Sequence, residues 1–397
     1  MGADNRQALR NFGLIILGNS VLGAPMPMLI ILGGLAGLLL APASELATIP
    51  ISVQILAGLL AAAPVSLFMG KYGRRAGFLL GAAFAVAGGT IGAAALYLTS
   101  FVALCLGHAL LGAALASFQY FRFAAAEAAE ESWRPTAISI TLASGLFAAL
   151  IGPEIFVQTK DTISAVPYAG AYAAIAVIGL VGCLPVLGIN LRAAEAAAAE
   201  PAEPAAHWTV IIRRRPVWVA ILCAAISFGV MTLLMTPTAL AMVGCGFSET
   251  QASDVIRWHV IAMFAPGFFT GALISRFGTG VIVAVGLGLL GVSAVVAIAD
   301  ITLIHFYVAL ILLGVGWNFG FIGGTTMLAA ALAPAERPVV QGINDTLIAL
   351  ASTIASFSAG ALIASVSWAA VAVAAFPMLA LALAGLGVLY LRKLQAV

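Results

Sequence analysis

The sequence predicts an all-α membrane protein with twelve transmembrane helices in two six-helix pseudo-repeats. Of its 397 residues, 63% are hydrophobic and only 8% are charged, whereas soluble domains carry about 25% charged residues. The apolar residues gather in twelve segments, each long enough to cross a hydrocarbon core of roughly 30 Å as a helix. Short motifs of the first half of the chain also return in the second half.

The apolar segments follow one another with mostly short connections. The first segment is too long for a signal peptide and lacks a convincing cleavage site, so we expect it to be the first membrane helix. The predicted spans are residues 12–40, 48–69, 76–98, 101–123, 135–157, 167–190, 217–243, 251–274, 280–299, 302–332, 338–362 and 367–391.

The positions of Lys and Arg predict the orientation of the chain. Of the 17 basic residues, all but Lys160 and Arg257 lie at the two ends or in or directly beside the connections after even-numbered spans. An excess of Lys and Arg marks the cytoplasmic side of a membrane helix bundle. We therefore expect both termini in the cytoplasm.

Two motifs relate the halves of the chain. Arg134-Pro135 precedes the fifth span and Arg337-Pro338 precedes the eleventh, while residues 70–73 (GKYG) match residues 275–278 (SRFG). The offsets are 203 and 205 residues. Two six-helix halves in parallel repeat, with the substrate held near the membrane midplane, describe the major facilitator architecture.

A stretch of distinct composition lies between the two halves. Residues 192–208 (RAAEAAAAEPAEPAAHW) are rich in Ala, Glu and Pro, and we expect a surface helix or a flexible strap there. His207 in this stretch is expected to be exposed and without function. The predicted domains are an N-terminal half (1–191), a cytoplasmic linker (192–216) and a C-terminal half (217–397).

Several function classes are not indicated. The net charge is only +2, and no basic block away from the membrane edges predicts a nucleic-acid partner. The four cysteines are scattered singly, without the spacing of a disulfide framework or a zinc site. No nucleotide-binding loop, catalytic triad or haem motif is present, so neither an enzyme nor a prosthetic group is expected.

The seventh and eighth predicted helices carry soft metal ligands at matching positions. The seventh contains Met231 and Met235, and the eighth contains His259 and Met263. Residues i and i+4 share one face of a helix, so each helix presents a pair of ligands on one stripe. Because the two helices run in opposite directions, the helical rise brings both pairs toward the middle of the membrane. We expect the four side chains to lie close together.

Thioether sulfur and imidazole nitrogen are ligands suited to Cu(I), whereas magnesium and calcium prefer oxygen. The residues leave a second interpretation open, because methionine also fills gaps in apolar cores and a buried histidine can be held by structural hydrogen bonds. Since both patterns occur in consecutive helices at matched depth, we interpret them as a copper(I) site, with the copper ion as the transported substrate.

M-x-x-x-M followed by H-x-x-x-M in the seventh and eighth helices resembles the CcoA-type copper importers, a branch of the major facilitator superfamily. The resemblance implies copper uptake by alternating access across the bacterial inner membrane, for assembly of cytochrome c oxidase. We expect a cytoplasmic thiol protein or small thiol to receive the ion. The metal-binding residues that the resemblance implies are Met231, Met235, His259 and Met263, with Cys223 and Cys245 as the flanking functional cysteines.

Residues 70–75 (GKYGRR) resemble the superfamily's loop motif between helices 2 and 3, G-x-x-x-D-R/K-x-G-R-R/K. Ser66 stands where this motif has its first Gly, and a Gly stands in place of the Asp. Without the carboxylate, we favour a role as positive-inside anchors for the basic residues Lys71, Arg74 and Arg75.

Some polar and sulfur-containing residues have two interpretations. Met26 and Met28 in the first helix fall near the position that matches Met231, and packing is favoured over a transient ligand role. Cys105 and His108 share a face of the fourth helix. Structural hydrogen bonding is favoured for His108 over a second metal step.

Ionisable residues inside a membrane are candidates for function. Asp254 and Arg257 lie one turn apart in the eighth helix and are expected to pair with each other. Glu154 and Asp345 are the remaining candidates for proton coupling.

Two other functions remain open. An importer of riboflavin or another small organic solute would share the fold, and a non-transporting copper receptor would share the metal site. The aromatic residues expected to line a cavity for a flavin are Phe118, Tyr120, Trp317, Phe319 and Phe321.

Overall fold

The structure is a computed structural model that describes residues 3–130, 133–191, 208–333 and 336–395, and every regular element in these ranges is a helix. The chain divides into two compact units. Unit 1 comprises Met1–Ala198 and Glu249–Arg257, and unit 2 comprises Ala199–Ser248 and Trp258–Val397. The predicted linker residues 192–207, including His207, lie outside the described ranges, and the predicted domain boundaries stay a prediction.

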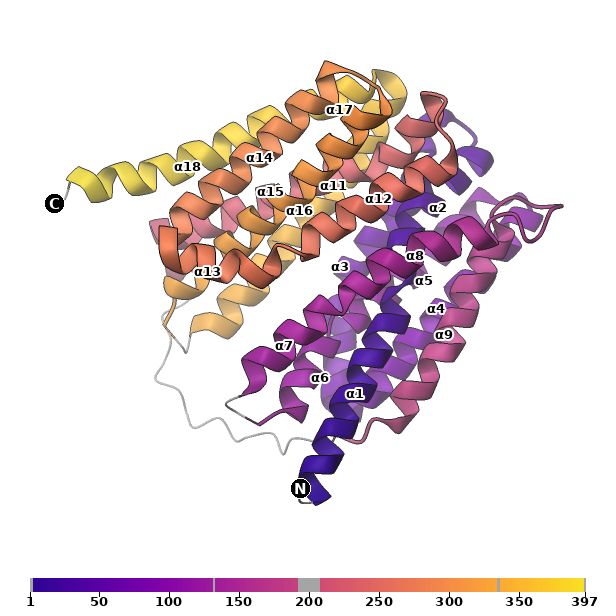
Figure 1. Cartoon of the computed structure of the whole chain (residues 1–397), viewed down its shortest axis with the longest axis horizontal. Helices are drawn as coiled ribbons and strands as arrows, with labels where there is room; N and C mark the ends of the chain where they lie inside the picture. Colours follow the sequence, from indigo (N-terminus) through magenta and orange to yellow (C-terminus); the bar gives the residue numbers. More distant parts are fainter. Residues whose placement is uncertain (1–2, 131–132, 192–207, 334–335, 396–397) are drawn as a thin grey trace. The chain divides into compact units, whose positions relative to one another are not determined.

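Unit 1 contains the helices coloured indigo to magenta in Figure 1, namely α1 (Ala3–Gly23), α2 (Pro25–Leu40), the short η1 (Ser44–Leu46), α3 (Ile49–Tyr72), α4 (Arg74–Tyr97), α5 (Phe101–Phe118), α6 (Phe121–Ala128), α7 (Arg134–Ala143), α8 (Gly145–Thr159) and α9 (Ala169–Gly188). Helix α4 packs against both α5 and α9, and α3 packs against α5.

Unit 2 contains α10 (Trp208–Ile211), α11 (Arg215–Gly244), α13 (Gly267–Phe277), α14 (Thr279–Ala299), α15 (Leu303–Ala330), α16 (Arg337–Ser365), α17 (Trp368–Val373) and α18 (Ala375–Gln395). Helix α12 (Glu249–Phe264) begins in unit 1 and ends in unit 2. The long helix α11 packs against α15, α16 and α18.

Within the described residues, ten helical spans are long and apolar enough to cross a membrane, and an eleventh appears if α12 and α13 are counted as one bent span. The prediction of twelve is therefore confirmed only in part. The predicted span 135–157 consists of α7 and α8, which have 10 and 15 residues and are each too short. The predicted span 251–274 is bent by 43° between α12 and α13.

An asparagine from a neighbouring helix satisfies the backbone at each of these two breaks. Between α7 and α8, Asn19 of α1 donates from its side-chain amide to the Thr141 carbonyl (3.0 Å) and the Ser144 hydroxyl (2.7 Å). Between α12 and α13, Asn318 of α15 donates to the Met263 carbonyl at 2.7 Å. Lipid offers no hydrogen bonds to a broken helix, so such partners must come from the protein.

The matched loop motifs have the same backbone conformation in both units. Gly73 joins α3 to α4 with φ of +87°, and Gly278 joins α13 to α14 with φ of +86°. A side chain is rarely tolerated at positive φ, which explains why glycine occupies both positions. The 205-residue sequence offset thus corresponds to a repeated turn.

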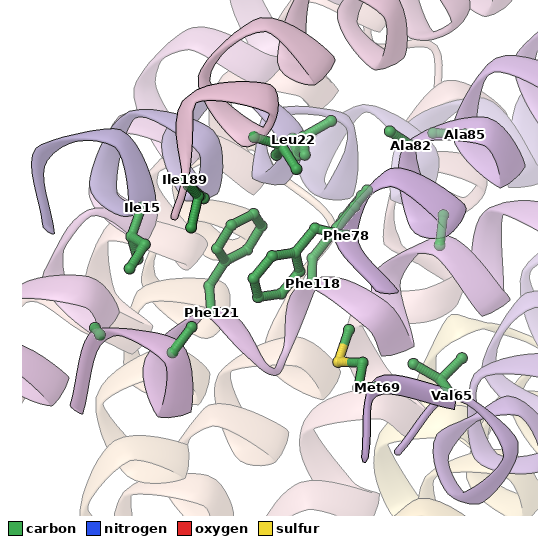
Figure 2. Close-up of a cluster of buried hydrophobic side chains, with 14 of the residues drawn as sticks. Ile15, Leu22, Val65, Met69, Phe78, Ala82, Ala85, Phe118, Phe121 and Ile189 are labelled. Carbon is green, nitrogen blue, oxygen red and sulfur yellow. The ribbon is translucent and has the colours of Figure 1, made fainter. Parts of the chain in front are cut away.

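Three buried phenylalanine rings pack together between the helices of unit 1 near this turn. Phe78 of α4 and Phe121 of α6 stack with their ring centroids 3.9 Å apart, and Phe118 of α5 lies beside them. Figure 2 shows the three rings together, with Met69 and Val65 of α3 nearby. Because lipid is itself apolar, such packing stabilises the bundle mainly through van der Waals contact.

The basic loop residues do more than anchor the chain at the membrane surface. Arg74 forms an ion pair with Glu127 of α6 (2.6 Å), and its guanidinium lies over the Tyr120 ring. In unit 2, Arg214 binds both carboxylate oxygens of Glu336, at 2.9 and 3.0 Å. The interpretation of Arg74 as an anchor alone was therefore too narrow, because Glu127 supplies a carboxylate that the loop motif lacks.

Candidate functional site

The four residues of the M-x-x-x-M and H-x-x-x-M motifs are all buried. Met231 and Met235 lie on α11, and His259 and Met263 lie on the part of α12 that belongs to unit 2. The His259 ring is held through Nδ1, which donates to the Leu310 carbonyl of α15 at 2.7 Å. Its Nε2 atom is buried without a hydrogen-bond partner among the described residues. A shared metal-binding role for the four side chains stays a prediction.

The two flanking cysteines lie in unlike surroundings. Cys223 is completely buried on α11, and its thiol points to the Ala382 carbonyl of α18 at 3.9 Å. Cys245 is exposed at the residue that follows α11, where partial burial raises the pKa of its thiol. Both cysteines are free thiols.

Four aromatic rings from three helices form a cluster in unit 2. Trp317 and Phe321, one turn apart on α15, stack with centroids 5.1 Å apart and planes inclined by 10°. Phe228 of α11 meets both rings edge-on, at 5.6 and 5.5 Å. Phe264, the last residue of α12, meets Trp317 edge-on at 6.2 Å. We call these four residues the aromatic cluster.

The sequence predicted only half of the aromatic cluster. Trp317 and Phe321 were expected to line a cavity for a flavin, whereas Phe228 and Phe264 were missed. Both missed residues lie close in sequence to the M-x-x-x-M and H-x-x-x-M motifs, which were interpreted as metal ligands. Their position beside those motifs on α11 and α12 was the signal from which they could have been identified.

The other three aromatic residues expected at a flavin cavity lie outside the aromatic cluster. Phe118 belongs to the hydrophobic core of unit 1, and Tyr120 of the same unit donates from its hydroxyl to the Ala62 carbonyl at 3.1 Å. Phe319 is buried on α15, two residues after Trp317. The structure therefore does not bring the five expected rings together in one unit.

The aromatic cluster contains an unsatisfied polar atom. The indole Nε1 of Trp317 is buried and has no hydrogen-bond partner among the residues that the structure describes. Ser227, next to Phe228 on α11, also has a buried hydroxyl without a partner in that part of the chain. Native proteins leave few buried polar atoms unpaired, so each exception calls for an explanation.

The bend between α12 and α13 lies beside the aromatic cluster. Pro266 cannot donate to the carbonyl of Ala262, four residues earlier, and at the same break the Met263 carbonyl accepts from the Asn318 amide at 2.7 Å. Thr270 donates to the Asn318 side-chain oxygen at 2.6 Å. Asn318 therefore fixes the end of α12, where Phe264 is located.

His108 of unit 1 is held by structural hydrogen bonds, as the sequence favoured. Its Nδ1 pairs with Gln54 of α3 at 2.9 Å, and its Nε2 pairs with the Tyr172 hydroxyl of α9 at 2.7 Å. Both ring nitrogens are thus occupied. Cys105, one turn earlier on α5, is a half-buried free thiol.

The predicted pair of Asp254 and Arg257 is present, with a distance of 3.0 Å. Arg257 also contacts Glu154 of α8 at 3.1 Å, and Lys160 contacts Glu249 at 2.9 Å, all within unit 1. Ion pairs therefore hold the first turns of α12 against α8 and against Lys160, the residue that follows α8. Glu154 is engaged in this pairing, and its role in proton coupling stays a prediction.

No protein-family model matches the chain. The riboflavin transporter RfnT of Brucella anthropi is 40% identical over 385 residues, which cover 96% of each chain. Two uncharacterised MFS-type transporters of Bacillus subtilis are each 30% identical: YddS, over 96% of this chain and 89% of its own, and YdeG, over 76% and 73%. The chain belongs to the major facilitator superfamily.

The fold agrees with this assignment. The crystal structure of the nucleoside transporter NupG matches with a TM-score of 0.67 at 14% identity, covering 96% of this chain and 98% of NupG. At this identity the likeness concerns the fold alone. The relatives are transporters, in keeping with the expectation that the chain is not an enzyme.

The prediction of a copper importer is wrong. The relative that is 40% identical over nearly the whole chain transports riboflavin, and nothing supports copper transport or a role in cytochrome oxidase assembly. The error has a physical reason, because methionines and a histidine at helical spacing also serve as packing residues. Met231 and Met263 are nearly inaccessible, and His259 is bound to a backbone carbonyl.

Proposed function

We propose that this superfamily member imports riboflavin or a closely related flavin by alternating access. The observation that carries the proposal is the 40% identity to a riboflavin transporter over 96% of both chains. The aromatic cluster on α11, α12 and α15 supports it, because the flavin ring is a flat aromatic system that stacks favourably on such side chains.

The site we propose combines apolar surface with a few polar atoms, as small-molecule sites generally do. Phe228, Phe264 and Phe321 are half-buried, so their rings are not fully enclosed by neighbouring helices. Trp317 and Ser227 add buried polar atoms without partners in the described residues. These groups suit a ring that carries both an aromatic face and polar edges.

We further propose that the chain lies in the bacterial cytoplasmic membrane with both termini inside. The distribution of Lys and Arg supports this orientation. Reporter fusions at each terminus, active only in the cytoplasm, test it. Activity of a periplasmic reporter at either end would contradict the proposed orientation.

Uptake of labelled riboflavin by a strain that cannot synthesise it tests the function. We expect saturable uptake that unlabelled riboflavin suppresses, and growth at low external riboflavin. Because stacking on an aromatic side chain contributes about 1–3 kcal/mol, Phe321→Ala should raise the KM roughly 5- to 150-fold.

The matched control is Phe268→Ala, which removes an exposed ring of α13 outside the aromatic cluster. It should leave uptake unchanged at equal protein abundance. Absence of riboflavin uptake and of riboflavin binding by the purified wild-type protein would overturn the proposed function.

A further inference from the structure

We infer that the indole N–H of Trp317 donates a hydrogen bond to a carbonyl oxygen of the transported ring and thereby selects planar heteroaromatic substrates with such an acceptor. The inference rests on the proposed function and assigns one of its specificity-determining residues. Its basis is the unpaired Nε1 atom of the ring that the other three members of the aromatic cluster contact.

The unpaired N–H is costly. Trp317 is only 7% exposed, and its Nε1 has no partner among the described residues. Indole can donate but cannot accept a hydrogen bond, so only an acceptor satisfies it. Leaving a buried donor unpaired costs more than the net gain of an ordinary hydrogen bond. An acceptor supplied by the substrate removes that cost when the substrate binds.

The direction of the N–H is fixed by the surrounding rings. Phe321 stacks on the face of Trp317, while Phe228 and Phe264 meet it edge-on. A ring contacted from three sides loses little further freedom on binding. The donor is thus placed before the substrate arrives, which lowers the entropic cost of the contact.

In this proposal, a movement of Phe264 exposes the donor to the substrate. It is the last residue of α12 and precedes the 43° bend at Pro266. The Asn318 amide, adjacent to Trp317 in sequence, holds the Met263 carbonyl at the same bend. A change in the bend would move Phe264 while the Trp317–Phe321 stack stays on the single helix α15.

The chemistry identifies the class of substrate. The flavin ring has two carbonyl oxygens on its pyrimidine part, and both accept hydrogen bonds. A site built to donate to such an oxygen discriminates against analogues without it, because its own buried group is then left unpaired. Aromatic hydrocarbons of similar shape would stack but leave the indole unsatisfied.

Trp317→Phe tests the inference because it keeps an aromatic ring and removes the donor. We expect the KM for riboflavin to rise about tenfold. Riboflavin analogues with sulfur in place of one ring carbonyl oxygen accept hydrogen bonds weakly. Wild-type protein should bind one of the two analogues less well, and the variant should bind riboflavin and that analogue alike.

Trp218→Phe is the matched control, since Trp218 lies on α11 and is 39% exposed. It should keep the wild-type KM and the wild-type discrimination. If wild-type protein transports riboflavin and Trp317→Phe keeps both the KM for riboflavin and the discrimination against the thio analogue, the inference fails while the proposed function stands. If wild-type protein binds both thio analogues as well as riboflavin, the inference fails without use of any variant.

Discussion

The buried histidines of the two units differ in how many of their ring nitrogens have hydrogen-bond partners. His108 in unit 1 has partners on both ring nitrogens, Gln54 and Tyr172. His259 in unit 2 has one partner, the Leu310 carbonyl, and its Nε2 is unpaired among the described residues. A fully paired network stabilises a helix bundle, whereas a buried polar atom without a partner is costly. The difference predicts that loss of His108 disturbs its unit more than loss of His259 disturbs the other.

The largest effect is expected from His108→Leu. The substitution leaves the Gln54 side chain and the Tyr172 hydroxyl buried without their partner, which costs about 1–3 kcal/mol for each group. His259→Leu removes one hydrogen bond and should destabilise less. Thermal unfolding of the purified variants in detergent measures both. Equal destabilisation by the two substitutions would remove the contrast between the fully paired histidine and the partly paired one.

A second prediction compares the two asparagines at the helix breaks. Asn19→Leu and Asn318→Leu each leave a carbonyl at a break unpaired, so each should lower the free energy of unfolding by about 1–3 kcal/mol. Only Asn318 adjoins the aromatic cluster. We therefore expect a severalfold higher KM for riboflavin in Asn318→Leu and a KM near wild type in Asn19→Leu. Equal KM changes would show that position 318 acts on stability alone.

The sequence predicted the helical architecture because hydropathy and charge are local signals. The glycines at 73 and 278 were found through a motif, and the structure gives them the same backbone conformation. The breaks at Ser144 and Pro266 were not predicted, because they depend on Asn19 and Asn318 from other helices. Spacing also could not separate ligands from packing residues in the M-x-x-x-M motif, and there the prediction of function failed.

The smallest effect concerns the ion pair of unit 2. Arg214 and the Ala333 N–H hold the pKa of the Glu336 carboxyl below its ordinary value. Because the folded pKa is lowered, the stabilising contribution is complete above the ordinary carboxyl pKa of about 4.3 and is lost as the pH falls through the lowered value. Glu336→Gln should therefore lower the Tm at pH 7, and the gap to wild type should close as the pH falls through the lowered pKa of the carboxyl. If the difference in Tm stays constant over this range, the contribution of the Arg214–Glu336 contact to stability does not depend on the charge of the carboxylate.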